Sequence, residues 1–337
     1  MSKGYQLMNL LHELPPVSHA VAYGSGVFKS FGSAAVSKST KVVDYIIAVS
    51  NAEEWHAENL QANPAHYGWT SRFIGGKRTA RIAERVGLGI HFNPFVNVGG
   101  QLCKYGVVST ETLLKDLDEW DHLYLAGRLQ KPVKPLVTSD EVDTAVKRNI
   151  RAALCAALLL MPENFTKREL YHRICSLSYD GDIRLVFAAE DRSKVDNIVS
   201  GSEKELDVLY LGELAGQCGA KAGLSGPGED GAWSQSEHSP SSSRSDLLAC
   251  IPQSILNEVS SKLGLGDLNF DCPNSRGSSA AALAREGRYP EALKDVIAAR
   301  VRQASIRQAK YGVLSTDLSK SVSYLGQKLH KAFLTRK

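Results

Sequence analysis

Hydrophobic and polar positions along the chain alternate between patterns typical of strands and patterns typical of helices. The run VVDYIIAV at 42–49 is apolar except for one acid, as in a strand that is covered on both faces. Further strands are predicted at 20–23, 90–98, 104–109, 123–129 and 183–187, and helices at 5–14, 52–63, 77–85, 140–161 and 167–177. This mixture predicts an α+β fold.

Two later segments have patterns of their own. Residues 216–245 are rich in Gly, Ser, Pro and acids, with Leu224 as almost the only aliphatic residue, which predicts a flexible insert. Near the end of the chain an apolar stripe recurs at steps of three and four residues, as on one face of a helix. The stripe consists of Leu314, Leu318, Val322, Leu325, Leu329 and Phe333. With the lysines and arginines around it, such a helix can lie on an anionic membrane surface or pack on the protein's own core.

Composition narrows the class of protein only slightly. With 337 residues, 43% hydrophobic and 23% charged, the chain is long enough for two domains, or for one large domain with appendages. The net charge of +4 suits an anionic partner but is shared by many other proteins. Six cysteines without a CxxC pair indicate a reducing compartment. The first residues match neither a transit peptide nor a secretory signal, so either no targeting segment exists or one was removed before this numbering begins.

A glycine turn and an acid on neighbouring strands carry the candidate chemistry. Gly24-Ser25-Gly26 follows the first predicted strand, and Asp44 lies inside the second. Glycines allow the backbone to approach a polyphosphate, and a serine hydroxyl with amide N–H groups can bind its oxygens. A carboxylate in an apolar strand is costly unless it is paired with a cation, so Asp44 is a candidate Mg²⁺ ligand or a partner for an arginine.

Several longer strings resemble the family of mitochondrial phosphatidate cytidylyltransferases, also known as translocator assembly and maintenance proteins. They are YGSGVFKS (23–30), VVDYIIAV (42–49), EEWHAENLQANPAHY (53–67), FNPFV (92–96), KYGVVST (104–110), LYLAGRLQKPVK (123–134), SLSYDGDIRLV (176–186), KVDNIV (194–199) and SIRQAKYG (305–312). The matches follow one another in order across nearly the whole chain.

The resemblance implies a polymerase-β-type nucleotidyltransferase domain at 1–137 and a winged-helix-like domain at 138–215. The flexible insert at 216–245 and a C-terminal region at 246–337, with an amphipathic membrane-contacting helix, complete the expected organisation. The implied reaction converts CTP and phosphatidic acid into CDP-diacylglycerol and pyrophosphate with Mg²⁺, upstream of cardiolipin and phosphatidylglycerol. The implied location is the matrix side of the mitochondrial inner membrane, where the protein would bind an anionic surface peripherally.

The resemblance also assigns roles to individual residues. Asp44, Asp182 and Lys104 are the expected catalytic residues, the two acids as metal ligands. The nucleotide-binding residues are expected to be Gly24, Ser25, Gly26, Tyr105, Arg128, Lys131 and Arg184, and Lys104 is expected to suit the triphosphate. His56, Asn59 and His66 also match family motifs, but a structural role fits them at least as well.

The sequence departs from the usual polymerase-β-type pattern at Ile46, where a second acid is expected. Another carboxylate must then complete the metal site, with Asp182 as first choice, Asp116 as second and Asp180 as a neighbour of the first. Two other functions remain possible on the sequence: nucleotidyl transfer to a soluble acceptor, and a non-catalytic, membrane-associated import factor. A basic, aromatic surface for nucleic acid is not evident.

Overall fold

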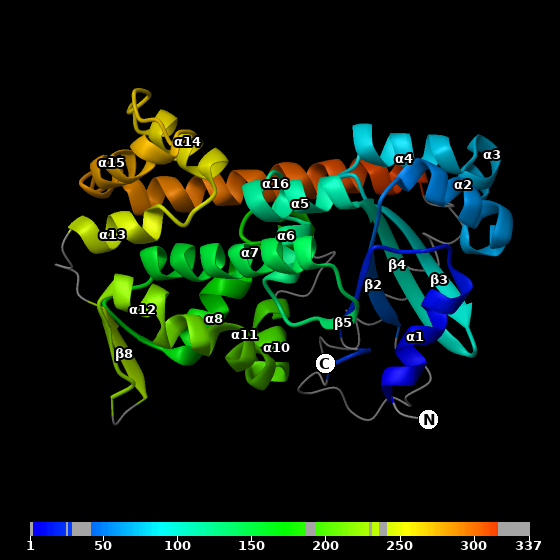
Figure 1. Ribbon diagram of the computed structural model, residues 1–337, viewed down its shortest axis with the longest axis horizontal. Helices are drawn as coiled ribbons and strands as arrows, with labels where there is room; N and C mark the ends of the chain where they lie inside the picture. The colour runs from blue at the N-terminus through cyan, green and yellow to red at the C-terminus, as the bar shows by residue number, and fades with distance from the viewer. Residues whose placement is uncertain are drawn as a thin grey trace.

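A five-stranded mixed sheet lies beside a long body of helices in the computed structural model (Figure 1). The structure describes residues 3–24, 26–28, 42–186, 193–228, 231–235 and 241–315. The strands are β1 (His19–Tyr23), β2 (Val43–Val49), β3 (His91–Val98), β4 (Gln101–Ser109), β5 (Lys134–Val137), β6 (Asn164–Thr166), β7 (Leu224–Ser225) and β8 (Ala232–Gln235). The α+β class predicted from the sequence is confirmed.

Helices make up most of the remaining described chain. In the first half they are α1 (Lys3–Glu13), α2 (Ala52–Ala62), α3 (Trp69–Ile74), α4 (Gly76–Arg85), α5 (Thr110–Glu119), α6 (Leu125–Leu129), α7 (Asp140–Leu160) and α8 (Lys167–Ser176). In the second half they are α9 (Ile183–Val186), α10 (Lys194–Gly201), α11 (Glu203–Ala215), α12 (Gln217–Ala222), α13 (Ser241–Leu248), α14 (Gln253–Lys262), α15 (Pro273–Ala284) and α16 (Tyr289–Ser315). Among the described residues, no helix is both long and apolar enough to cross a membrane.

The large sheet has the strand order β3-β4-β2-β1-β5, with β2 and β4 parallel and the other neighbours antiparallel. Its central strand β2 contributes to two separate apolar clusters. Val43, Tyr45 and Ile47 pack with Leu10 of α1 and with other residues of that face. Ile46 and Ala48 belong to the cluster on the other face, which continues into the helices. The prediction of a strand covered on both faces is therefore confirmed, and Asp44 lies at the beginning of that strand.

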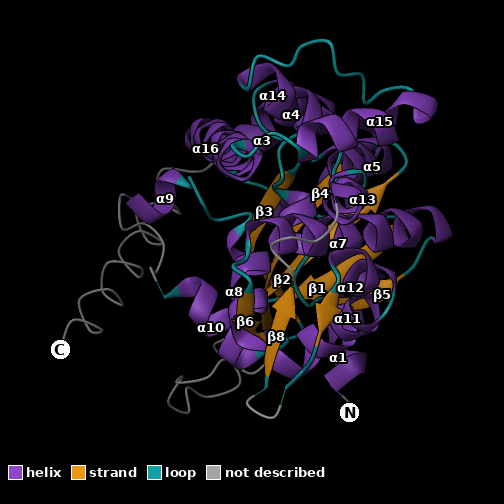
Figure 2. Cartoon of the chain, turned by 90° about the vertical axis from the view of Figure 1, so that its left-hand side faces the viewer, coloured by secondary structure: helices purple, strands orange, loops and turns teal. Residues whose placement is uncertain are grey.

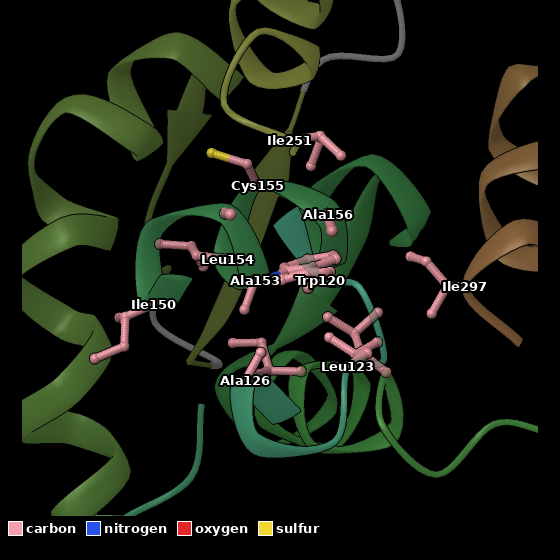
Figure 3. Close-up of a cluster of buried hydrophobic side chains, with 14 of the residues drawn as sticks. Trp120, Leu123, Ala126, Ile150, Ala153, Leu154, Cys155, Ala156, Ile251 and Ile297 are labelled. Atoms are coloured by element: carbon pink, nitrogen blue, oxygen red, sulfur yellow. The ribbon is translucent and has the colours of Figure 1, made fainter. Parts of the chain in front are cut away.

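The apolar core runs without a break from the sheet into the helical body. Figure 3 shows its centre, where Trp120 lies among side chains of α7, including Ala153 and Ala156, with Ile251 and Ile297 nearby. The indole nitrogen of Trp120 donates a hydrogen bond to Asn149 Oδ1 over 2.8 Å, so its polar atom is satisfied inside the core. Sheet and helices share this core across the boundary predicted at residue 137, which fixes their relative position.

Helix α16 connects the two ends of the molecule. At 27 residues it is about 40 Å long, and it runs from α15 past α5 to the neighbourhood of α4 (Figure 1); Figure 2 shows it nearly end-on. Midway, Arg300 donates to the backbone oxygen of Trp120 over 3.0 Å. Near its end, the hydroxyl of Tyr311 lies 2.6 Å from Nδ1 of His91 on β3. The helix thereby ties the sheet to the C-terminal helices.

Two segments predicted as strands are helical instead. Within 123–129 the chain forms α6, because the carboxylate of Asp116 accepts the N–H groups of Leu125 and Ala126 at 2.8 and 2.9 Å and so fixes the beginning of the helix. At 183–187 the described residues form α9, where Asp182 Oδ1 accepts the N–H of Arg184 over 2.9 Å. In both places a preceding acid satisfies N–H groups that an isolated short helix would leave unpaired.

The segment predicted as a flexible insert contains regular structure in its described part. Helix α12 buries Cys218, and β8 pairs with both β6 and β7 in a small second sheet. The side-chain amide of Gln235 donates to three backbone oxygens, those of Leu158, Met161 and Pro162. Small residues here permit close packing: a Cβ at Gly219 would lie 1.8 Å from the oxygen of Leu214. The predicted apolar stripe at 314–333 lies outside the residues whose side chains are described.

Candidate active site

A row of three side chains crosses the sheet on β1, β2 and β4. Tyr23 pairs with Asp44 between β1 and β2, and Asp44 pairs with Lys104 between β2 and β4. Because successive side chains of a strand point to opposite faces, these three share one face, and it is the face of Val21 and Ile46. Asp44 therefore has a phenol on one side and an ammonium group on the other.

The glycine turn lies directly against Asp44. Gly24 has φ +84°, and its carbonyl oxygen accepts the N–H groups of Val27 and Phe28, each at 3.0 Å. A Cβ built on Gly24 would lie 3.0 Å from Asp44 Oδ2, and one on Gly26 would lie 2.5 Å from the oxygen of Val42. Both glycines are thus required by geometry, and the turn brings backbone to the carboxylate. Ser25, between them, is outside the described residues.

Arg128 of α6 covers the β1 side of the row. Its guanidinium carbon lies 4.9 Å from the centre of the Tyr23 ring, and Nη2 donates to the oxygen of Pro132 over 3.0 Å. The Nε atom is buried and has no hydrogen-bond partner within the described part of the chain. Burial raises the pKa of Tyr23 well above its usual value; the charge of Asp44 adds to this rise, whereas Arg128 opposes it. The phenol therefore stays protonated between the acid and the cation.

Lys131 extends this positive region into the helical body. It is only 2% exposed, and its ammonium group donates a hydrogen bond to Ser178 and lies 5.0 Å from the ring centre of Tyr179. Burial, together with the charges of Arg128 and Lys194, lowers the pKa of Lys131 to about 7. Adjacent cations inside a protein raise each other's energy, and an anion bound beside them offsets that cost.

Lys104 is the cation on the β4 side. Its ammonium nitrogen lies 4.5 Å from the centre of the Phe92 ring, within the range of a cation–π interaction. The ring in turn lies over Gly106, where a Cβ would be 2.5 Å from Phe92 Cε1. Lys104 is half-buried, so its charge can be reached from outside. The ring of Phe92 thus supports this ammonium group at the β4 end of the row, next to Asp44.

Asp182 and Arg184, both expected at the site, bind each other. Asp182 is 2% exposed, and its two carboxylate oxygens accept from Nε and Nη2 of Arg184 and from the Arg184 backbone N–H. This loop packs on α16, because the N–H of Ile183 donates to Ser305 over 3.2 Å. The pairing gives each residue a structural partner and argues against Asp182 as the second metal ligand.

The other two candidate acids are also engaged. Asp116 is buried and accepts four backbone N–H groups, from His122, Leu123, Leu125 and Ala126. Asp180 lies 3.7 Å from Arg173, and burial raises its pKa. Within the described ranges, no group of three or more His, Cys, Asp or Glu side chains is arranged to hold a metal ion.

Tyr105 lies on the opposite face of the sheet from Asp44 and Lys104. Its hydroxyl, fully buried, lies 2.9 Å from Nδ2 of Asn59 and 2.9 Å from Nδ1 of His66. His56 contacts Tyr67 in the same network, with Nδ1 2.8 Å from the hydroxyl oxygen. These hydrogen bonds fix α2 to the back of the sheet. The structure thus separates Tyr105 from the predicted nucleotide site, and the structural alternative for His56, Asn59 and His66 fits their geometry.

Sequence reasoning did not single out several residues that the structure brings to the site. They are Phe92, Tyr124, Ser178, Tyr179 and Lys194. A signal for all five existed, because each lies inside a string that carries the family resemblance, at 92–96, 123–134, 176–186 or 194–199. Their roles depend on contacts between distant segments, which the strings do not specify.

A glycine turn at a strand end, an acid on the next strand and cations on both sides of that acid are features of nucleotidyl-transferring enzymes. The chain belongs to the family described as "Phosphatidate cytidylyltransferase, mitochondrial", whose pattern matches residues 7–331. The protein of that name from Xenopus laevis is 34% identical over 97% of this chain and 94% of its own length. Its counterpart from Drosophila melanogaster is 35% identical, covering 95% and 96%. The Schizosaccharomyces pombe protein is 42% identical over 58% of this chain and 49% of its own.

Proposed function

We propose that this protein transfers the cytidylyl group of CTP to phosphatidic acid, which gives CDP-diacylglycerol and pyrophosphate. The observation that carries the proposal is the contact between the Gly24 turn and the carboxylate of Asp44, with cations on either side. The family described above supplies the identity of the two substrates. The products would enter the synthesis of phosphatidylglycerol and cardiolipin.

The polyphosphate would lie against the glycine turn. Without side chains at Gly24 and Gly26, backbone N–H groups can approach its oxygens closely. Asp44 fits Mg²⁺, because this ion is usually bound by one or two carboxylates together with substrate phosphates and water. When bound, Mg²⁺ would neutralise charge on the triphosphate and on the leaving pyrophosphate. Asp44 would orient the metal-bound nucleotide, and Arg128 would place a fixed positive charge beside it.

The chemical step is a displacement at the α-phosphorus. A phosphate oxygen of phosphatidic acid forms a new P–O bond there, and the bond from the α-phosphorus to the oxygen that bridges to the β-phosphorus breaks. That oxygen leaves with the electron pair as part of pyrophosphate. A phosphomonoester has its second pKa at about 6, so the nucleophile is already ionised near neutral pH and no protein base is required. Positioning and charge neutralisation would supply most of the rate.

The test uses purified protein with CTP labelled in the α-phosphate, phosphatidic acid and Mg²⁺, followed by extraction of the lipid. We expect labelled CDP-diacylglycerol from the wild type and loss of turnover by at least about 100-fold in Asp44→Asn. The matched control is Asp118→Asn, whose partly exposed carboxylate pairs with Arg148 away from the row. A wild type that labels no lipid with any of the four nucleoside triphosphates would refute the proposal, and label on a soluble acceptor would favour the alternative transferase.

Because phosphatidic acid lies in a bilayer, we further propose that the protein binds membranes peripherally, on the matrix side of the mitochondrial inner membrane. The names of the relatives support a mitochondrial location. The apolar stripe within 314–333, with the lysines and arginines around it, is the segment proposed to contact anionic lipid. Deletion of residues 313–337 should abolish co-sedimentation with anionic vesicles while CTP binding remains. Unchanged co-sedimentation would rule out this segment as the anchor.

A further inference from the structure

The two sides of Asp44 carry cations of different kinds. On the β1 side lie the Gly24 turn, Arg128 above Tyr23, and Lys131 farther into the helices. On the β4 side Lys104 stands over Phe92. Since neighbouring strands are about 4.8 Å apart, β1 and β4 are about 10 Å apart across β2. The site thus offers two anion-binding regions, separated by the carboxylate.

The geometry of phosphoryl substitution requires two such regions. In an in-line displacement, the attacking and the leaving oxygen lie on opposite sides of the phosphorus atom. The glycine turn, which lets backbone approach a polyphosphate, is on the β1 side together with Arg128. The leaving pyrophosphate therefore belongs to the β1 side, and the attacking phosphate must come from the β4 side.

We infer that Lys104 binds the phosphomonoester of the acceptor lipid, and not the triphosphate as the sequence led us to expect. The inference rests on the proposed function and assigns one substrate to each side of Asp44. Lys104 would hold the anionic headgroup next to the α-phosphorus and offset the repulsion between two phosphate groups that must approach each other. An ammonium group suits this role because it offers three donors to a tetrahedral anion.

The surroundings of Lys104 agree with this role. Although Asp44 is its neighbour in register, Lys104 makes no ion pair within 4.0 Å with any acid in the part of the chain that the structure describes. Its ammonium group rests on the Phe92 ring, which Gly106 leaves room for. Its positive charge is therefore held in place without being neutralised, and the half-buried side chain is accessible to an incoming phosphate.

The experiment separates binding of the two substrates. Dihexanoyl phosphatidic acid, used below its micellar concentration, gives the KM of the acceptor without a membrane, and calorimetry with CTP and Mg²⁺ alone gives the Kd of the nucleotide. For Lys104→Met we expect the KM of the phosphatidic acid to rise about 10- to 100-fold, as for the loss of one charge-assisted hydrogen bond, while the Kd of CTP stays within about 2-fold. Arg128→Met should show the reverse, and Lys115→Met, an exposed lysine of α5, should change neither.

Lys104→Arg should recover part of the loss, because it restores the charge, and Lys104→Gln should not. Melting curves of all variants would show whether they remain folded, and Lys104→Arg still permits the comparison if Lys104→Met does not. A Kd for CTP that rises at least about 10-fold in Lys104→Met, with an unchanged KM for the phosphatidic acid, would overturn the inference and place Lys104 at the triphosphate. A wild type that binds CTP but forms no CDP-lipid would instead refute the proposed function itself.

Discussion

Replacing Gly24 by alanine tests the contact on which the proposed site depends. Gly24 has φ +84°, and an added Cβ would lie 3.0 Å from Asp44 Oδ2. The left-handed backbone costs about 1–2 kcal/mol for a residue with a side chain. In addition, the carboxylate must move by a few tenths of an ångström, since a Cβ atom rarely approaches an oxygen so closely. The substitution therefore combines a cost in stability with a displacement of the candidate metal ligand.

Gly100 provides a matched control for the backbone cost. It has the same φ of +84° in the turn between β3 and β4, but a Cβ there would meet nothing within 4 Å. For a chain of 337 residues, the entropy of unfolding is about 0.7 kcal/mol per degree, so each variant should lower the Tm by about 1–3 °C. Only Gly24→Ala moves Asp44, and we expect it to lower kcat by about 10- to 100-fold, while Gly100→Ala keeps the wild-type rate.

The assay is the CTP-to-lipid transfer described above, with kcat measured at saturating CTP and Mg²⁺ and Tm measured by calorimetry. Wild-type kcat in Gly24→Ala would show that the contact with Asp44 has no part in catalysis. An equal loss of activity in both variants would attribute the effect to backbone strain, and it would remove the argument that the turn positions the carboxylate.

Three further predictions follow from individual contacts. The pKa of Lys131 is lowered to about 7 in the folded protein, so between pH 7 and about 10 the folded protein releases a proton that the unfolded chain keeps. The free energy of unfolding should therefore rise with pH over this range. Urea titrations of Lys131→Met should show a smaller rise, because this proton is missing from the variant. Tyr311→Phe leaves the buried Nδ1 of His91 without its partner at 2.6 Å, so urea titrations should show a loss of about 1–3 kcal/mol with kcat unchanged; equal stability would contradict this. Phe92→Leu removes the ring beneath Lys104 and should raise the KM of phosphatidic acid about 2- to 5-fold without altering CTP binding, whereas weaker CTP binding would refute the assignment.

The sheet and the glycine turn could be predicted because their signals are local. In β2 an apolar run with one acid specifies a strand buried on both faces, and the structure shows Asp44 at its beginning. The absence of a second acid at Ile46 also has a local reason. Ile46 is on the same face as Asp44 but 2% exposed in the apolar core, where a carboxylate would lose its hydration without gaining a partner.

The cations of the β1 side could not be placed from the sequence, because distant segments position them. Lys131 is buried against Ser178 and Tyr179, which come 47 and 48 residues later in the chain. The two segments lie close to each other at Gly127, where an added Cβ would lie 2.2 Å from the Cβ of Ser178. Similarly, the run at 123–129 has the apolar content of a strand. The carboxylate of Asp116 accepts two N–H groups at the beginning of the helix that forms there, and this helix presents Arg128 to Tyr23.

Because of these contacts, the protonation of Lys131 on the β1 side depends on whether an anion is bound beside it. With a pKa of about 7, Lys131 loses its proton readily above neutral pH, because burial and the neighbouring cations disfavour the ammonium form. A polyphosphate beside it acts in the opposite direction and favours that form. On the proposed function, nucleotide binding would restore a positive charge next to the leaving group, inside a low-dielectric region where such a charge is most effective. Lys104, by contrast, is half-buried on the ring of Phe92 on the other side of Asp44, which agrees with a role toward an acceptor that arrives from outside.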